Sequence, residues 1–350
     1  MHKMKDFKIG KHTIGEGHKP FIIAEMSGNH NQSVERGLQI IEAAAAAGAH
    51  AVKLQTYTPD TMTLKGVITI EDKDSLWYGR ELYDLYQEAY TPWEWHAPLF
   101  KRAKELGLEI FSTPFDETAV DFLESLEVNV YKIASFENTD WPLLKKVAQT
   151  GKPVIMSTGA ASIADISQAV EILRNNGCKD LVLLKCTSTY PATPENTNLN
   201  TIPHLRDLYS CLVGLSDHTL GVGVSIASVA LGACVIEKHF TLSRQEGGVD
   251  SAFSMEPAEM KSLVVESERA FLGMGKIQYG VQKAETKSLI YKRSIYVAED
   301  INAGEKFTRE NVRVIRPGCG LHSKYYEGLI GKTAKLDLKR GKPLTFDDLI

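Results

Sequence analysis

The sequence of 350 residues has few cysteines and no long apolar segment. Its five cysteines are an odd number without a Cys-x-x-Cys pair, which argues against a disulfide framework and favours a reducing compartment. No stretch approaches the ~18 consecutive apolar residues that a membrane span needs, and the N-terminus lacks the apolar core of a secretory signal. These absences predict a cytoplasmic protein that does not associate with a membrane.

The sequence also lacks a strong charge of either sign. Lysine and arginine together number 40 and aspartate and glutamate 44, so the net charge is -4 and the pI is near 6.2. This balance argues against a nucleic-acid-binding surface. Hydrophobic residues make up 43% and charged residues 24%, as in ordinary globular proteins with a large core. The length suits a barrel of about 250 residues followed by one small domain.

Short apolar runs alternate with helical patterns along most of the chain. The first helical pattern has a capping serine, Ser33, before it and a terminating glycine, Gly48, after it. The expected strands are residues 21–27, 51–57, 109–115, 130–136, 153–159, 181–189, 212–218 and 234–240. The clearest helical patterns are residues 34–48, 91–107, 162–177, 221–232 and 256–273.

Eight strand-then-helix units predict a parallel sheet with right-handed crossovers, and eight is the number that closes a (β/α)8 barrel. The alternative is an open doubly wound sheet, which the lack of a glycine-rich first turn disfavours. After residue 285 the helical spacing gives way to short β-like runs with glycine turns. We therefore predict an α/β TIM-barrel domain at residues 1–285 and a small β-rich domain at residues 286–350.

The segment from Thr58 to Tyr90 is long for a connection between a strand and a helix, and it is dense in aromatic residues. Long loops in compact domains are commonly functional. We expect this segment to form a lid over the mouth of the barrel.

Two histidines stand at the ends of consecutive predicted strands, His218 after the seventh and His239 after the eighth. Active residues of barrel enzymes lie at the carboxyl ends of the strands, so we expect the two imidazoles side by side. Such a pair suits Mn²⁺ or Co²⁺ and leaves coordination positions open for water and substrate. The alternative is that they are two unrelated polar residues.

Lysines recur within otherwise apolar strands, as Lys53, Lys132 and Lys185. A buried lysine needs an anionic partner, which is either a structural carboxylate such as Glu25 or Glu237, or the phosphate and carboxylate of a substrate. Hydroxyl groups at the strand ends favour the substrate, because they bind phosphate oxygens. These hydroxyls belong to Ser112, Thr113, Ser135, Ser157, Thr158, Thr187, Ser188 and Ser216.

Polar residues with carboxylate or amide groups complete the predicted mouth. Glu25, Gln55 and Glu137 end the first, second and fourth strands. A carboxylate in a water-poor site acts as a general acid or base, or else balances the charge of Lys53 or a metal. Asp250 follows the last strand and is either a ligand of sugar hydroxyls or a solvated loop acid. We expect His30 to be a loop residue that closes the site rather than a ligand.

A set of sequence runs falls in order at the predicted strand ends: FIIAEMSGNH, AVKLQTY, YKIASFE, MSTGA, CTSTYP, GLSDHT and EKHF. On these runs the chain resembles the sialic acid synthase family, and the runs RSIYVAEDI, RPGCG, IGK and KRGKPL resemble its C-terminal antifreeze-like (SAF) domain. The lid stretch LWYGRELYDLYQEAYTPWEWH resembles the pseudaminic acid branch more than the N-acetylneuraminate branch. Ser188 also stands where neuraminate-type members carry asparagine.

The resemblance implies a transferase that condenses phosphoenolpyruvate with 2,4-diacetamido-2,4,6-trideoxy-L-altrose and water, giving pseudaminic acid and phosphate by C–O cleavage. N-acetylneuraminate or legionaminate synthesis from a related N-acetyl sugar is the alternative. It also implies a divalent metal ion, Mn²⁺ first and Mg²⁺ or Co²⁺ otherwise, held by His218 and His239.

The resemblance assigns the remaining residues as well. It places phosphoenolpyruvate on Lys53, Thr113, Lys132, Ser135, Ser157, Ser188 and Ser216. It places the sugar near Gln55, Glu137, Tyr190 and Asp250, with the partner subunit's Arg316 at the N-acetyl group in a domain-swapped homodimer. Glu25 is the candidate for moving the proton of the attacking water.

Two rival functions fit some of the same residues. A class I aldolase would form a Schiff base on Lys185 or Lys132. A non-catalytic carbohydrate-binding protein would use the small domain beside a degenerate barrel, which the histidine pair and the lysines disfavour.

Overall fold

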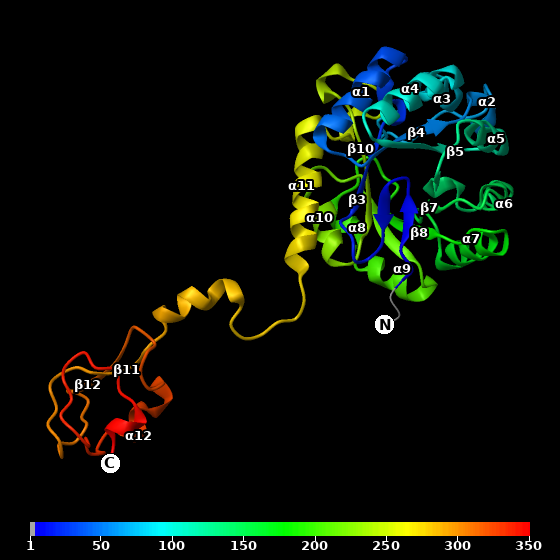
Figure 1. Cartoon of the computed structure of the whole chain (residues 1–350). Coiled ribbons are helices and arrows are strands. Elements are labelled where there is room, and N and C mark those ends of the chain that lie inside the picture. The colour runs from blue at the N-terminus through cyan, green and yellow to red at the C-terminus, as the bar shows by residue number, and fades with distance from the viewer. Residues whose placement is uncertain (1–3) are drawn as a thin grey trace. The chain divides into compact units, whose positions relative to one another are not determined.

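The computed structural model describes residues 4–350, which divide into two compact units (Figure 1). The first unit ends at Gly275 and the second runs from Lys276 to Ile350. The boundary between the units therefore lies before the domain boundary that we predict at residue 285. No helix in the described part of the chain combines the length and apolar character needed to cross a membrane.

Eight parallel strands form the centre of the first unit, which confirms the predicted barrel. Hydrogen-bonded neighbours follow the order β5-β4-β3-β10-β9-β8-β7-β6, and the two end strands, β5 and β6, pack against each other in a nearly closed barrel. The strands are β3 (Phe21–Glu25), β4 (Ala51–Thr56), β5 (Glu109–Pro114), β6 (Tyr131–Ile133), β7 (Val154–Ser157), β8 (Leu181–Cys186), β9 (Leu212–Ser216) and β10 (Val235–His239).

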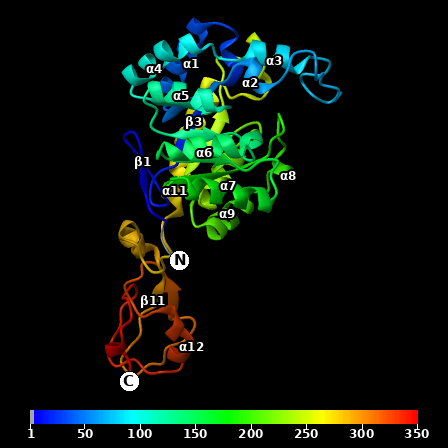
Figure 2. The same ribbon diagram turned by 90° about the vertical axis from the view of Figure 1, so that its right-hand side faces the viewer.

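Helices lie around the outside of these strands (Figures 1 and 2). Helix α1 begins after Ser33, whose hydroxyl accepts a hydrogen bond from the Arg36 amide, and ends at Gly48 in the left-handed region, as its sequence signals predict. The others are α4 (Trp93–Glu105), α5 (Glu117–Ser125), α6 (Trp141–Gln149), α7 (Ile163–Asn175), α8 (Pro194–Thr197), α9 (Thr201–Tyr209), α10 (Gly223–Ala230) and α11 (Pro257–Met274); α1 spans Val34–Ala47.

Side chains on each strand alternate between two cores, because successive residues of a strand point to opposite faces. On β3, Phe21 and Ile23 pack inside the barrel, whereas Ile22 and Ala24 pack against the helices. The inner core also contains Ile9 of an N-terminal hairpin that the sequence analysis did not predict. The hairpin strands are β1 (Phe7–Ile9) and β2 (His12–Ile14). Its apolar residues join the barrel core away from the strand ends that carry the polar residues.

The second unit has its own small core and a β-rich fold, as predicted. Strands β11 (Ser294–Val297) and β12 (Val312–Ile315) pair antiparallel, and isolated bridges such as Ile301 with Leu338 join the surrounding loops. Its core is formed by Ile295, Val297, Ile301, Phe307, Val312, Leu321, Leu329, Ala334, Leu338 and Leu344. It also contains α12 (Tyr326–Leu329) and, before β11, the 3₁₀ helix η5 (Lys283–Tyr291).

Candidate active site

The strand alternation brings the predicted polar residues together at one end of the barrel. The face of β3 that carries Phe21 and Ile23 inside ends in Glu25, and on β10 the face of Val235 ends in Glu237 and His239. The same alternation applies on the other strands, where inward-facing apolar residues are followed by polar ones. These polar residues are Lys53, Thr113, Lys132, Ser157, Ser216 and His218. A closed barrel therefore gathers them above its apolar interior.

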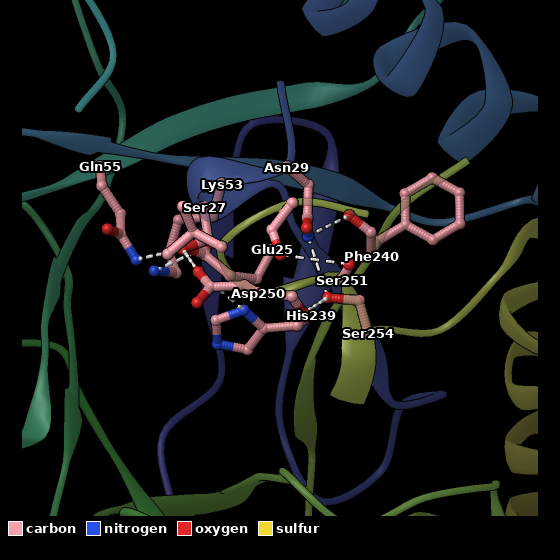
Figure 3. A network of polar contacts seen from close by, with 12 residues as sticks. Glu25, Ser27, Asn29, Lys53, Gln55, His239, Phe240, Asp250, Ser251 and Ser254 are labelled. Atoms are coloured by element: carbon pink, nitrogen blue, oxygen red, sulfur yellow. Dashed lines mark hydrogen bonds and ion pairs between the residues drawn. The ribbon is translucent and has the colours of Figure 1, made fainter. Parts of the chain in front are cut away.

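Lys53 is the centre of one buried network (Figure 3). Its ammonium group lies 2.7 Å from Glu25 Oε2 and donates a hydrogen bond of 2.8 Å to Thr113 Oγ1. Gln55 Nε2 donates to Glu25 Oε1 and to Ser27 Oγ, both at 3.0 Å. Lys53 therefore has a protein carboxylate as its partner, the structural alternative in the sequence analysis, while its other surroundings are hydroxyls.

Lys132 is the centre of a second network. Its ammonium group donates to Ser157 Oγ at 2.8 Å and lies 3.7 Å from Glu237 Oε1, which also accepts a hydrogen bond of 3.2 Å from Ser216 Oγ. The second carboxylate oxygen of Glu237 is buried and has no hydrogen-bond partner among the described residues. The Lys132 ammonium group also donates to the Ile133 carbonyl at 3.1 Å. The pair with Glu237 at 3.7 Å is longer than a direct charged hydrogen bond, so one of the three ammonium donors remains for an anion.

Burial and charge act in opposite directions on these groups. Burial lowers the pKa of Lys132. Burial opposes the charged form of Lys53, but Glu237 and Glu25 outweigh it and raise the pKa of that lysine. Burial raises the pKa of Glu25 to about 7, against the pull of Lys53. The Lys53 ammonium therefore stays charged near neutral pH, whereas the neighbouring Glu25 carboxylate is close to its protonation midpoint.

Gly159 leaves a small space that two predicted hydroxyls enter. A Cβ atom at Gly159 would lie 2.1 Å from Ser188 Oγ and 2.6 Å from Ser135 Oγ, so no other residue fits there without displacing them. Asn138 Nδ2 donates to the Gly159 carbonyl at 3.2 Å and holds the turn in place. The sequence analysis did not name Gly159, although it belongs to the MSTGA run at the end of β7.

His218 and His239 lie side by side, as predicted, with ring centroids 5.4 Å apart. Each ring is buried, and burial lowers the pKa of His218 to about 4 and that of His239 well below its ordinary value, so both imidazoles are neutral. His218 Nδ1 lies 3.0 Å from the Thr187 carbonyl oxygen and donates to it, which leaves the lone pair of Nε2 free. His239 Nδ1 is buried without a hydrogen-bond partner within the described residues.

These features fit a shared metal ion. The ring centroids lie 5.4 Å apart, so a nitrogen of each imidazole could contact the same divalent ion. Among residues 4–350, no group of three or more histidine, cysteine, aspartate or glutamate side chains is placed to hold a metal. An ion here would therefore have two protein ligands, and its other positions would be filled by water or substrate oxygens.

A cavity of about 310 Å³ lies beside the histidine pair, and the predicted sugar residues line it. They are Gln55, Glu137, Tyr190 and Asp250, together with Ser27 and His239. Asp250 is buried and hydrogen-bonded to Ser27, so it is not the solvated loop acid of the alternative reading. Burial raises the pKa of Glu137 to about 7, and its Oε2 has no hydrogen-bond partner among the described residues. That oxygen is free to accept from a sugar hydroxyl.

The loop that carries Asp250 is tied to the start of the barrel (Figure 3). Asn29 Nδ2 donates to the Phe240 carbonyl at 3.0 Å and to Ser254 Oγ at 2.9 Å. Ser254 Oγ in turn donates to the Asp250 carbonyl at 2.7 Å. These bonds join the 3₁₀ helix η1 (Ser27–His30) to the loop after β10 and fix the Asp250 side of the cavity.

The Thr58–Tyr90 segment covers part of this cavity, in agreement with the predicted lid. It contains α2 (Pro59–Met62) and α3 (Leu82–Ala89), and its residues Ile70, Trp77 and Leu85 line the cavity.

Two predicted residues, Lys185 and His30, lie outside the anion pocket and the cavity, and Arg316 lies in the second unit, where the sequence analysis expects it. Lys185 sits on the helix-facing side of β8, with the outward Leu183, and its ammonium donates to the Cys186 carbonyl and to Thr187 Oγ1. It is therefore not part of the inward anion pocket. His30 is buried against the Trp95 ring and does not line the cavity. Arg316 is exposed in the second unit.

Comparison with known proteins identifies the family of this chain. A model of the NeuB family matches residues 40–279, and a model of the SAF domain matches residues 292–350.

The chain belongs to the NeuB family.

The relatives of this chain include a pseudaminic acid synthase of Campylobacter jejuni, which is 44% identical over 94% of this chain and 96% of the relative. An N,N'-diacetyllegionaminic acid synthase of the same species is 36% identical over 92% of this chain and 97% of the relative. Among solved structures, an N-acetylneuraminic acid synthetase of Leptospira borgpetersenii in complex with citrate matches this NeuB-family chain with a TM-score of 0.74 and 32% identity. That match covers 83% of this chain and 97% of the other.

Proposed function

We propose that this NeuB-family chain condenses phosphoenolpyruvate with 2,4-diacetamido-2,4,6-trideoxy-L-altrose and water to give pseudaminic acid and phosphate. The observation that carries the proposal is a pair of buried lysines among hydroxyls, directly beside two neutral imidazoles and a cavity of sugar size. The 44% identity to the Campylobacter jejuni pseudaminic acid synthase supports this branch of the family over the legionaminic branch at 36%.

Phosphoenolpyruvate carries a phosphate and a carboxylate, and both need cations and hydrogen-bond donors. Lys53 and Lys132 supply the charge in a buried site, where electrostatic interactions are stronger than in water. The hydroxyl donors are Thr113, Ser135, Ser157, Ser188 and Ser216. Ser135 and Ser188 meet at Gly159, where the absence of a side chain leaves room for both hydroxyls.

His218 and His239 are the proposed ligands of a divalent ion, with Mn²⁺ as the first candidate and Mg²⁺ or Co²⁺ as substitutes. When bound, the ion supplies a Lewis acid that polarises the aldehyde carbonyl of the open-chain sugar. Both imidazoles contribute neutral nitrogens, and the orientation of the His218 ring is fixed because its Nδ1 is held by the Thr187 carbonyl.

The carbon–carbon bond forms between C3 of phosphoenolpyruvate and C1 of the aldehyde. The aldehyde oxygen becomes a hydroxyl by taking one proton of the water that adds at C2, and the second proton of that water leaves with phosphate. Positive charge develops at C2 of the former phosphoenolpyruvate, and a water molecule adds there. Glu25 takes the proton of that water, since its carboxylate is held by Lys53 and Gln55 and its pKa lies at about 7. The tetrahedral intermediate then loses phosphate by cleavage of its C2–O bond, and Lys53 and Lys132 stabilise the departing charge.

The sugar occupies the cavity lined by Gln55, Glu137, Tyr190 and Asp250. We further propose that the partner subunit's Arg316 reaches the N-acetyl group in a domain-swapped homodimer. Its exposure, next to the end of β12, is consistent with a role in an interface. Mixing inactive His239→Ala chains with inactive Arg316→Ala chains tests this, because heterodimers regain one complete site. Absence of any regain would contradict the swap.

The decisive experiment measures phosphate release from phosphoenolpyruvate with three acceptors side by side. These are the pseudaminic precursor, the legionaminic precursor and N-acetylmannosamine. The proposal expects kcat/KM to be highest for the pseudaminic precursor. A preference for another acceptor assigns another branch of the family, and no release with any of them rejects the function.

We also propose a cytoplasmic location, in keeping with the five free cysteines.

A further inference from the structure

The cavity beside Asp250 has two kinds of wall. Its polar groups come from the ends of β3, β4 and β10 and from the loops that follow β6, β8 and β10. Its apolar residues come largely from the lid and from the positions directly after β4 and β5. The polar part is explained by a hydroxylated substrate that reacts near His239. The apolar part has no role in the chemistry described so far.

The apolar wall is formed by one face of α3 and by an aromatic cluster behind it. Leu82, Leu85 and Tyr86 are spaced so that they share one side of the helix, and all three line the cavity. The Tyr57 ring packs edge-on against Tyr86 at 5.7 Å and against Phe115 at 5.2 Å. Tyr57 is only 2% exposed, so the cluster is rigid before any ligand enters.

One hydrogen bond joins the lid to the loop after β10, and others hold the lid segment together. The Trp77 indole donates to the Val249 carbonyl at 3.1 Å, next to Asp250. Within the lid, Ile70 and Leu82 amides donate to the carbonyls of Arg80 and Ile68 at 2.9 and 3.0 Å. These bonds fix the start of α3 relative to the barrel mouth. The apolar wall is therefore part of the binding site rather than a mobile surface.

We propose that Leu82 and Leu85 of α3, together with Phe115, select the methyl groups of the acceptor sugar and exclude a sugar with a hydroxyl at C6. This inference rests on the proposed function and names the part of the site that sets its acceptor preference. A 6-deoxy sugar with two acetamido groups presents methyl groups that bury favourably against leucine and phenylalanine. A C6 hydroxyl placed there loses its water and finds no hydrogen-bond donor or acceptor on the leucine and phenylalanine side chains.

The test compares two acceptors of the same configuration that differ only in a hydrogen or a hydroxyl at C6. Phosphate release from phosphoenolpyruvate gives kcat/KM for each. The wild-type chain is expected to prefer the 6-deoxy sugar by roughly 10- to 100-fold, the range for a hydroxyl in an apolar pocket. Leu82→Asn and Phe115→Tyr each add a polar group to the wall, and each is expected to lower the preference about tenfold. The KM for phosphoenolpyruvate stays unchanged, since its proposed ligands lie elsewhere.

Matched controls come from the same lid. Leu64 and Leu76 are 71% and 52% exposed and do not line the cavity, so Leu64→Asn and Leu76→Asn keep the wild-type preference. Leu82 and Phe115 are half-buried, and unchanged melting temperatures confirm that their variants fold.

Three outcomes are distinguishable. The inference is supported if Leu82→Asn and Phe115→Tyr lower the preference for the 6-deoxy sugar and the control variants Leu64→Asn and Leu76→Asn do not. Equal use of both sugars by the wild type, or an unchanged preference in both wall variants, overturns it while phosphate release still supports the proposed function. Absence of phosphate release with every amino sugar rejects the proposed function, and the inference falls with it.

Discussion

The ammonium group of Lys238 lies 3.1 Å from the carboxylate of Asp217, and both side chains are shielded from solvent. Each residue directly precedes one of the paired histidines, so the strand alternation turns the ion pair away from the barrel interior. Lys238 also donates hydrogen bonds to the carbonyls of Thr219 and Gly221, at 2.6 and 3.0 Å. The Asp217 carboxylate accepts a hydrogen bond of 2.6 Å from the Ser225 hydroxyl of α10. The pair therefore joins the ends of β9 and β10 behind the imidazoles.

Replacing Lys238 with methionine is expected to destabilise the fold and the metal site together. The change leaves Asp217 buried without its cation, which costs about 3–5 kcal/mol in the free energy of unfolding. Because the pair supports both imidazoles, Mn²⁺ affinity falls by about 10- to 100-fold. Urea unfolding and Mn²⁺ titration followed by electron paramagnetic resonance measure the two effects. The double variant Lys238→Met/Asp217→Asn regains part of the stability; equal losses in the single and double variants would contradict this account.

Removal of the metal is expected to stop condensation. Treatment with EDTA abolishes phosphate release, and added Mn²⁺ restores it, because the proposed ion activates the aldehyde. His239→Ala removes one of the two ligands, so its Mn²⁺ titration shows no tight site. His204→Ala, an exposed histidine in α9, binds Mn²⁺ like the wild type. Full turnover in rigorously metal-free protein would rule out the proposed chemistry.

The carboxylate of Glu137 is expected to lower the free energy of unfolding at alkaline pH. Burial raises its pKa from 4.5 to about 7, so the folded state binds the proton more tightly than the unfolded state. The stabilising contribution is present below pH 4.5 and is lost as the pH rises through about 7. Above that pH, Glu137→Gln is more stable than the wild type by up to about 3 kcal/mol.

Urea unfolding between pH 4.5 and pH 8 measures this difference. Glu137→Asp keeps a carboxylate and serves as the matched control, since it retains the pH trend that Glu137→Gln loses. The same Glu137→Gln variant is expected to bind the acceptor sugar less tightly. A stability difference that does not change with pH would contradict the buried, ionising carboxylate.

Trp77→Phe keeps an aromatic ring in the lid but loses the indole donor to the Val249 carbonyl. A hydrogen bond of this kind contributes about 1 kcal/mol, so the KM for the acceptor sugar rises about fivefold. The KM for phosphoenolpyruvate is unchanged, because the lid residues do not contact its lysines. Trp141→Phe, at a position 47% exposed and outside the cavity, is the control. Equal changes in the two KM values would show that Trp77 acts on the fold as a whole.

Much of the site follows from a single regularity in the sequence. A strand of the barrel places alternate residues inside, so a polar residue an even number of positions after an inward apolar residue is predicted to point inward as well. Phe21 predicts Glu25 in this way, and Val235 predicts His239. The same regularity excludes Lys185, which is one position out of phase with the inward Leu184. Grouping Lys185 with Lys53 and Lys132 by residue type was therefore wrong, and counting along the strand would have avoided it.

Other features depend on contacts between distant segments. Nothing near Gly159 in the sequence indicates that Ser188 and Ser135 approach it, because they belong to other strand ends. The Lys238–Asp217 pair likewise requires that β9 and β10 be neighbours, and that α10 bring Ser225 to the same carboxylate. The N-terminal hairpin was missed because its strands are only three residues long.

The sequence by itself determined the barrel, the β-rich second domain and the chemical types at the strand ends, because periodicity and turn residues are local properties of a chain. The tertiary structure decided which of those groups meet. It set the 5.4 Å between the rings of His218 and His239, the partners of each lysine and the apolar wall that the lid adds to the cavity. Distances of this kind arise only when strands pair and the sheet curves into a barrel, since pairing and curvature bring together residues that are far apart along the chain.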